Sequence, residues 1–374
     1  MTSYRIVSIR IPETAEGPVP VWLVAHTELE AAVHREALGH EDLITPPDRM
    51  FAPLVDQREE RKHVFAAVAE DAVTDELGLP TDTADYLGFA FLGLPLTDNL
   101  HLAFSDVAVA AEHRGRGIGT ALWKAAEQTL RQAGRTTVTA WSINREPAEG
   151  EERLIPPTES GVIAVDAISR FAVRHGFTLE QVERHSTLVL PVAPEDTAAW
   201  QTEAQQKAGP DYRLVQWADD TPAEWLDALA ELYRRMSVDV PQGGLELEEE
   251  AWDAERVRRR DQLLAKAKQD YVLTAAEHVP SRRLVAFTII KSPQGKPAAY
   301  QDETLVHGEH RGKRLGLWVK AANLEYLARE HPKVERIHTW NADENEHMLA
   351  INVRIGFRAA SLEGAWQRKL LRSE

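Results

Sequence analysis

The sequence contains one short glycine-rich string twice, 197 residues apart. The first copy is His113-Arg114-Gly115-Arg116-Gly117-Ile118-Gly119, and the second is His310-Arg311-Gly312-Lys313-Arg314-Leu315-Gly316. Each copy follows a strand-like stretch and opens a helix-like one, so successive backbone N–H groups converge at a helix start. Glycine allows an anion to approach closely, and the helix dipole favours negative charge. The string therefore predicts a phosphate-binding turn, present twice.

The elements around the two strings repeat in the same order. The predicted strand, helix and strand are 100–110, 119–133 and 136–141 in the first copy, and 299–306, 315–331 and 335–340 in the second. A further helix leads to Gly176-Phe177 and to Gly356-Phe357, and the shorter offset there matches a proline-rich insertion at 143–161. A chance repeat would not preserve both the order of the elements and the glycine residues that end them. The pattern predicts an internal duplication of one α/β unit.

The chain has 374 residues, enough for two ordinary domains. We predict an N-terminal domain at 1–192, a Pro/Ala/Glu/Gln-rich linker at 193–210 and a C-terminal domain at 211–374. The charged run Glu246–Glu250 is predicted to be the solvated start of a helix over 248–268. Trp141 and Trp340, at equivalent positions, are predicted to pack in the core.

Composition excludes several classes of protein. The absence of cysteine excludes disulfides, a thiolate nucleophile and cysteine metal sites. The sequence shows no apolar run that would span a membrane and no signal peptide, so we expect a cytoplasmic protein without a membrane partner. A net charge of −16 disfavours binding to nucleic acid and suits a cationic substrate, although solubility alone explains it more simply.

The first string, together with Val109 upstream, resembles motif A of the GNAT acyltransferase superfamily, Arg/Gln-x-x-Gly-x-Gly/Ala. The following strand and the helix before Gly-Phe resemble later motifs of that family. The resemblance extends to about 80 residues of each half and implies two tandem GNAT-like domains. Each would be α/β (α+β), with a mixed, mostly antiparallel sheet flanked by helices. It also implies acetyl-CoA, or another acyl-CoA, as co-substrate and direct acyl transfer to an amine.

The resemblance assigns cofactor-binding residues position by position. They are Val109, Arg114, Gly115, Arg116, Gly117, Ile118, Gly119 and Thr120 in the first copy, and Val306, Arg311, Gly312, Lys313, Arg314, Leu315 and Gly316 in the second. Asn341 and Asn345 of the second copy resemble the family's asparagines that hold the pantetheine arm or the adenosine end. Arg314 departs from the pattern, since the family has a glycine there. The first copy thus has the better loop and the second the better arm site, and we favour the second as active.

Direct transfer needs a base for the incoming ammonium and often an acid for the leaving thiolate. Glu303 and Asp106 occupy equivalent places before the loops, and Glu303 is the first candidate base. In many relatives the acid is a tyrosine, but here those positions are Ala172 and Asn352, of which Asn352 can donate only a hydrogen bond. His113 and His310 are more simply turn residues than catalysts. His307, His310 and Glu303 suggest a metal site only weakly, because a glycine interrupts them, and we expect no metal.

Three functions fit these residues. The first is an N-acetyltransferase acting on a small-molecule or peptide amine. The second is a non-catalytic acyl-CoA-binding or interaction protein with degenerate domains, which the missing tyrosines favour. The third is a relative that uses another acyl donor, such as aminoacyl-tRNA, which the acidic balance disfavours. The sequence does not distinguish a monomer from a homodimer.

Overall fold

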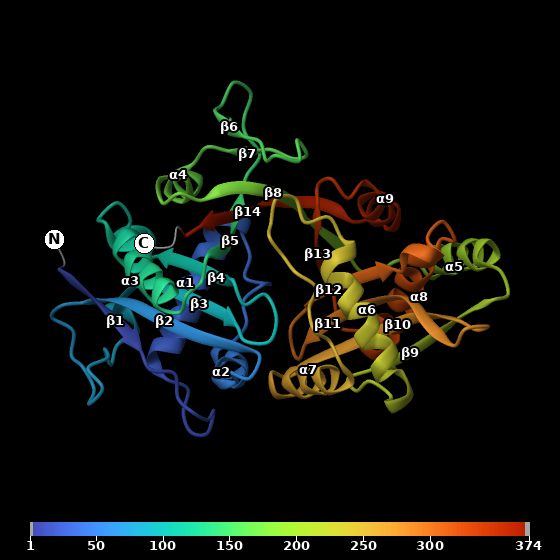
Figure 1. Cartoon of the computed structure of the whole chain (residues 1–374), viewed down its shortest axis with the longest axis horizontal. Coiled ribbons are helices and arrows are strands. Elements are labelled where there is room, and N and C mark those ends of the chain that lie inside the picture. The colour runs from blue at the N-terminus through green and yellow to red at the C-terminus, as the bar shows by residue number, and fades with distance from the viewer. Residues whose placement is uncertain (1–2, 371–374) are drawn as a thin grey trace. The chain divides into compact units, whose positions relative to one another are not determined.

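The computed structural model describes residues 3–370, and its elements run twice through the same order (Figure 1). The first set is β1 (Tyr4–Ile9), α1 (Val21–Leu38), α2 (Pro47–Val55), β2 (Glu60–Ala69), β3 (Tyr86–Pro95), β4 (Leu102–Val109), α3 (Ile118–Gln132), β5 (Thr137–Asn144), α4 (Ala167–Arg174) and β8 (Thr178–Val189). The second set is β9 (Tyr212–Ala218), α6 (Leu226–Asp239), α7 (Ala254–Lys266), β10 (Gln269–His278), β11 (Arg283–Pro293), β12 (Ala298–Val306), α8 (Leu315–Glu330), β13 (Arg336–Ala342), α9 (Glu346–Ile355) and β14 (Arg358–Lys369). The predicted duplication is confirmed.

The described residues divide into two compact units. The first unit holds residues up to Leu154, then Ile163–Glu180, and those from Gly364 onward. The second unit holds Ile155–Val162 and Gln181–Glu363. The boundary between Glu180 and Gln181 falls inside β8, and the boundary between Glu363 and Gly364 falls inside β14. Each unit is therefore completed by a strand segment from the other half of the sequence, which differs from the predicted boundaries at 192 and 211.

Each unit contains a mixed, mostly antiparallel sheet. The strand order in the first unit runs β1-β2-β3-β4-β5, and in the second unit β8-β13-β12-β11-β10-β9. The parallel pairs are β4 with β5 and β12 with β13. The paired residues of β12 and β13 are Ala298–Gln301 and Arg336–Thr339, after which the two strands diverge. The sheet is thus split locally into a V-shaped gap, and β4 and β5 part in the same way after Phe104 and Thr139.

The strands are apolar on both faces because helices cover both. In β10, Tyr271, Leu273 and Ala275 pack with the helix layer of α6 and α7. The alternate residues Val272 and Ala276 face clusters that contain α8. Since successive side chains of a strand point to opposite faces, a near-continuous apolar run indicates a sheet between two helix layers. The predicted fold class is confirmed.

The structure corrects three predictions for individual elements. Helix α7 begins at Ala254, because Asp253 caps it by accepting a hydrogen bond from the Arg256 N–H, so the run Glu246–Glu250 precedes the helix. The stretch predicted as a linker, 193–210, contains helix α5 (Pro194–Ala208), which begins with proline in its first turn. Trp141 is 37% exposed and is not a core residue.

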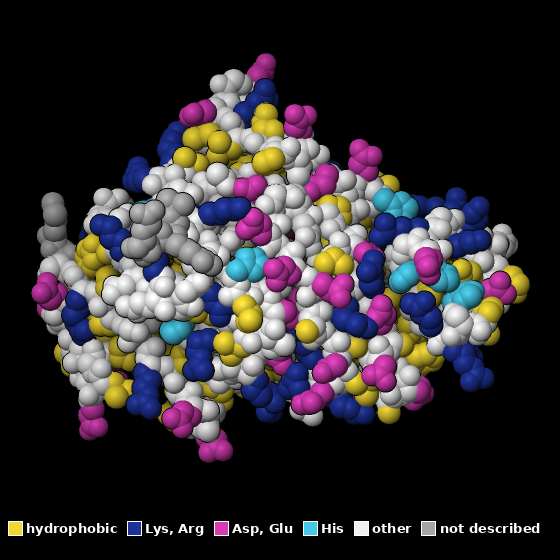
Figure 2. All heavy atoms as spheres, viewed as in Figure 1, with side chains coloured by type: hydrophobic (Ala, Val, Ile, Leu, Met, Phe, Trp, Pro, Cys, Tyr) yellow, Lys and Arg dark blue, Asp and Glu magenta, His cyan; other side chains and the backbone are white. Residues whose placement is uncertain are grey.

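Surface charge is mixed. On the face drawn in Figure 2, acidic and basic side chains are interspersed. None of the helices within residues 3–370 is both long and apolar enough to cross a membrane.

Candidate functional site

A cavity of about 210 Å³ lies in the second unit where β12 and β13 diverge. Its walls come from β12, β13, β8, α6, α8 and the start of α9. The lining residues are Gln181, Glu183, Met236, Val240, Pro241, Asp302, Thr304, Lys320, Thr339, Trp340, Asn341, Ala342, Asn345 and Met348. Pairing between β12 and β13 stops at Gln301 and Thr339. Beyond these residues the facing main-chain N–H and C=O groups of the two strands are not bonded to each other, so a narrow ligand could bind them.

The second glycine string forms the turn between β12 and α8, as predicted. Gly312 has φ +77°, and a Cβ built on it would meet nothing within 4 Å, so the loop is open on that side. Arg314 adopts the left-handed conformation (φ 60°, ψ 20°) at the helix N-cap, where no side chain caps the helix. Its guanidinium forms an ion pair with Glu203 of α5. Arg314 therefore reproduces the backbone shape that a glycine would give, while its charge is engaged elsewhere.

The first string forms the same turn between β4 and α3. Gly115 and Gly117 have φ +75° and +84°, and a Cβ on Gly115 would also meet open space. The side chains of the loop arginines have partners within the protein: Arg114 donates to both carboxylate oxygens of Glu36 at 2.8 Å and to the Val109 carbonyl. Arg311 matches it by donating to the Val306 carbonyl at 3.2 Å.

A further predicted residue of the first loop is engaged by its side chain. The Thr120 hydroxyl lies 3.2 Å from His175 Nε2. Thr120 and the loop arginines thus have structural partners of their own. What both loops offer an anion is backbone N–H at an uncapped helix start.

The predicted asparagines come together beside the cavity. Asn341 and Asn345 line it, and the Asn345 side chain also caps α9 by accepting from the Met348 N–H. Asn352 Nδ2 donates to Asn341 Oδ1 at 2.6 Å, while its own Oδ1 is buried and has no hydrogen-bond partner among residues 3–370. An unsatisfied buried acceptor is costly, so Asn352 fits a ligand that brings an N–H group.

Asp302 and Glu303 form a pair of neighbouring carboxyl groups in β12. The register between β11 and β12 shifts between Thr288 and Ile290, which places a bulge on β12 at these acidic residues. Lys291 forms an ion pair with Asp302, and Arg260 NH2 lies 3.9 Å from Asp302 Oδ2 and 3.8 Å from Glu303 Oε2. Burial alone would raise the pKa of Asp302, but Lys291 and Arg260 outweigh it and hold the pKa at about 2.

Glu303 has the properties of a base that works near neutral pH. Burial, together with repulsion by Asp302, raises its pKa to about 7. Its side chain is 26% exposed and is hydrogen-bonded to the Asp302 carboxyl group. The sequence allowed Glu303 to be selected, but no local pattern marked Arg260 or Tyr233 as site residues. The hydroxyl of Tyr233, on α6, is buried and has no hydrogen-bond partner within residues 3–370. Arg260 lies over the Tyr233 ring at 5.0 Å.

Asp106, the equivalent residue of the first unit, lies in a different acidic cluster. Asp106 is exposed, but the surrounding protein displaces part of the water around its carboxyl group. This desolvation, together with repulsion by Glu30, raises the pKa of Asp106 to about 6. Burial raises the pKa of Glu30 to about 7, and His26 Nε2 lies 3.7 Å from its carboxylate. His26 and Glu30 are one turn apart on α1, and sequence reasoning missed both because only the fold brings them to β4.

Histidines cluster at two further places. His307, Glu309 and His310 each offer one ligand atom within 4.8 Å of the others, but Glu309 is exposed, and Tyr212 lies 2.8 Å from His310 Nδ1. The carboxylate beside these histidines is Glu309, where the sequence suggested Glu303. The one carboxylate of this group is exposed and one of its histidines already has a tyrosine partner, so the group does not resemble a preformed metal site.

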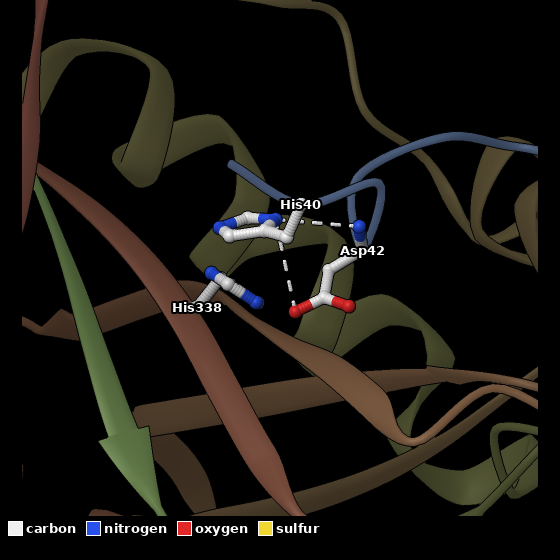
Figure 3. Close-up of side chains that lie close together, drawn as sticks. All are labelled: His40, Asp42 and His338. Atoms are coloured by element: carbon white, nitrogen blue, oxygen red, sulfur yellow. Dashed lines mark hydrogen bonds and ion pairs between the residues drawn. The ribbon is translucent and has the colours of Figure 1, made fainter. Parts of the chain in front are cut away.

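The second cluster lies after α1 in the first unit (Figure 3). The Asp42 N–H donates to His40 Nδ1 at 3.4 Å, and Asp42 Oδ2 lies 3.8 Å from the same nitrogen. His338, also drawn there, belongs to the second unit, where its ring stacks on His185 at 5.1 Å. His185 in turn stacks on Trp340, whose indole N–H donates to Glu363. Trp340 thus lines the cavity and is held by partners on neighbouring strands.

Comparison with solved structures defines the class. A tandem GNAT protein from the clavulanic acid biosynthesis pathway, solved without acetyl-CoA, matches with a TM-score of 0.71 and 23% identity over 100% of both chains. A GCN5-related N-acetyltransferase from Sphaerobacter thermophilus matches with a TM-score of 0.58 and 15% identity over 97% of this chain and 95% of that one. A glucosamine N-acetyltransferase region of a fungal multi-domain β-N-acetylglucosaminidase matches with a TM-score of 0.60 and 14% identity, over 98% of this chain and 38% of that one. The fold is that of a tandem GNAT protein.

The acetyltransferase (GNAT) family model matches residues 36–148. These residues include β2 to β5, the first glycine string and α3. This part of the first half is therefore similar in sequence to the acetyltransferase (GNAT) family. No curated protein sequence matches the chain.

Proposed function

We propose that this chain is an acyl-CoA-dependent N-acyltransferase that passes an acetyl group directly from acetyl-CoA to a primary amine. The observation that carries the proposal is the cavity between the diverging ends of β12 and β13. It is also lined by Lys320 of α8, the helix that follows the open loop. The diphosphate would bind the loop amides, and the pantetheine arm would lie in the gap. The thioester would then reach the cavity.

Glu303 is the proposed base. With a pKa of about 7 it is largely ionised at slightly alkaline pH and strong enough to accept a proton from an incoming ammonium group. Proton removal frees the nitrogen lone pair to attack the thioester carbon. The tetrahedral intermediate then collapses by breaking the C–S bond, and main-chain N–H groups of the unpaired strand edges are suited to stabilise its oxyanion.

The net charge of −16 suits a cationic acceptor, whether a small-molecule or a peptide amine. The supply of acyl-CoA is consistent with a cytoplasmic location. We place catalysis in the second unit because the arm-binding asparagines and the cavity occur there. The first unit, with its two loop glycines, is proposed as a second acyl-CoA site, and a monomer or a homodimer would suit either arrangement.

The test combines binding with turnover. Titration calorimetry with acetyl-CoA is carried out on the wild type and on the matched charge reversals Arg116→Glu and Lys313→Glu, which lie at equivalent loop positions. Each reversal should weaken binding to its own unit roughly tenfold or more, because it places a carboxylate beside the diphosphate. Release of free thiol with a panel of primary amines should fall about 100-fold in Glu303→Gln and change little in Asp106→Asn.

The variants also separate the alternatives. Loss of turnover in Asp106→Asn with activity retained in Glu303→Gln would move catalysis to the first unit. Acetyl-CoA binding without turnover on any amine would favour a non-catalytic acyl-CoA-binding protein, the function suggested by Asn352 and Ala172 in place of the usual tyrosine. No binding of acetyl-CoA to the wild type would refute both.

A further inference from the structure

Lys320 is a buried lysine in a wall of the cavity. It lies on α8, five residues after the helix begins at Leu315, and is 2% exposed. At about 1.5 Å of rise per residue, it stands roughly 7.5 Å along the helix from the phosphate loop. Its Nζ lies over the face of Phe357, 5.8 Å from the ring centre. Lys320 thus brings an ammonium group with three N–H donors to the cavity wall, and within residues 3–370 it forms no ion pair.

The fold does not require a lysine at this position. The equivalent residue of the first unit, 197 positions earlier, is Trp123. Trp123 is also buried, and its ring meets Phe177 at 5.1 Å, as Lys320 meets the equivalent Phe357. An aromatic side chain therefore fills this place well in the sister unit. Retaining a buried amine here costs stability, which points to a chemical role.

The charge balance of the cavity favours proton transfer over binding of an anion. Glu183 of β8 and Asp302 of β12 also line the cavity and would repel a negatively charged acyl chain. Asp302 is ion-paired to Lys291, and Lys320 has no such partner. Burial lowers the pKa of Lys320 to about 7. Such a group can give up and regain a proton near neutral pH.

We propose that Lys320 is the proton donor to the departing thiolate of coenzyme A in the second unit. This inference rests on the proposed function and supplies the acid that Asn352 cannot provide. The amine nitrogen forms a bond to the acyl carbon, the C–S bond breaks, and its electron pair goes to sulfur. The Nζ–H proton of Lys320 moves to that sulfur, and the extra proton on the acceptor nitrogen passes to water, which leaves the amide. The neutral amine of Lys320 then regains a proton from water.

The probe is coenzyme A itself, because its thiol would lie beside Lys320 whether or not an acceptor is known. Ultraviolet absorption of the thiolate is followed against pH for coenzyme A bound to the wild type, Lys320→Met and Lys320→Arg. The bound thiol should titrate about one unit or more lower in the wild type than in Lys320→Met, since a nearby cation stabilises the thiolate. Lys320→Arg should keep the low thiol pKa, and exposed Lys333→Met should match the wild type.

Turnover adds a second readout. Lys320→Met and Lys320→Arg should both lose about 100-fold in acyl transfer, because arginine keeps its proton. The affinity for coenzyme A should change little in either variant. The Lys320→Arg arm also keeps the test decisive if Lys320→Met does not fold, which circular dichroism would show.

Three results would overturn the role of Lys320. One is a thiol that titrates identically in the wild type and in Lys320→Met. Another is loss of coenzyme A binding in a folded Lys320→Met protein, which would make Lys320 a binding residue. The last is stoichiometric acetylation of Lys320 by acetyl-CoA followed by transfer to an amine, which would make it a nucleophile. A wild type that binds no coenzyme A would instead refute the proposed function.

Discussion

At the scale of single residues, the bulge in β12 decides the chemistry of the second unit. It brings Asp302 and Glu303 together with Arg260, so that one carboxyl group holds its negative charge while the other is driven towards its protonated form. Two groups of the same type thereby acquire separate pKa values through their surroundings. In the first unit, β3 and β4 pair in regular register from Gly88 to Gly93, and Asp106 lacks such a carboxyl neighbour on its own strand.

Glu303→Gln tests this residue-scale picture through stability. The pKa of Glu303 is raised in the folded protein, so the wild type loses stability as the pH rises from the unfolded value, about 4.3, to about 7. Glutamine does not titrate. The free energy of unfolding of the variant should therefore rise relative to that of the wild type by on the order of 1 kcal/mol between pH 5 and pH 8. This figure allows for the screening by solvent of a partly exposed group. Urea unfolding at both values measures it. Equal differences at the two pH values would contradict the assignment.

The sequence allowed Glu303 and Asp106 to be selected because they occupy equivalent positions of the repeat. It allowed the asparagines to be selected because they resemble a family pattern. It did not allow Lys320, Arg260, His26 or Glu30 to be selected. Their importance comes from burial and from partners on distant elements, and neither leaves a local pattern. Arg314 lies between these cases: its departure from glycine was visible, but its pairing with Glu203 depends on where α5 packs.

At the scale of elements, regular amphipathic segments were predictable and proline-containing helices were not. Helix α3 differs from its predicted bounds, 119–133, by one residue at each end. Helix α2 carries Pro47 at its start and Pro53 inside it, a composition typical of a turn. The same bias made α5 resemble a linker. Proline is tolerated in a first helical turn, where the missing N–H has no partner to lose.

Helix α8 offers an element-scale prediction, since it buries Lys320 in its second turn. Burial lowers the pKa of this lysine, so the folded state holds fewer protons than the unfolded state between about pH 7 and pH 10.5. Wild-type stability therefore rises with pH across that window. Lys320→Met should be more stable than the wild type by on the order of 3 kcal/mol at pH 6, and this advantage should shrink towards pH 10.

Chemical unfolding at these two pH values provides the measurement for α8. Lys333→Met, which changes an exposed lysine, serves as the control and should leave stability within about 0.5 kcal/mol. A Lys320→Met protein that is less stable than the wild type at pH 6 would show that the ammonium has a stabilising partner.

At the scale of the whole molecule, the two units share strands. Residues 364–370 complete the first unit: the Gly364 N–H donates to Asn144 Oδ1, and the indole N–H of Trp366 donates to Ser142. Arg368 forms an ion pair with Glu127 of α3 at 3.0 Å. In exchange, β8 pairs with β13 in the second unit. The repeat in the sequence correctly predicted two copies, but it could not show which copy receives each final strand.

A fragment of residues 1–192, the predicted N-terminal domain, tests this arrangement. It lacks Trp366, which is 1% exposed, and burial of a side chain of this size stabilises by about 3–5 kcal/mol relative to alanine. The fragment should therefore unfold at a much lower urea concentration than the same fragment with residues 364–370 fused through a flexible linker. Fluorescence-monitored unfolding compares them. Equal midpoints would show that 1–192 is an autonomous folding unit.

The exchanged strand also constrains the order of events on the ribosome. Translation delivers residue 192 long before residue 364, so nascent chains must wait for nearly the entire message before the earlier half can close its sheet. During that interval β5 is an edge strand, because β14 has not yet been synthesised. Its unpaired main-chain groups can then form hydrogen bonds with strands of other chains. Chaperone dependence in the cell should therefore follow the time needed to synthesise the second half.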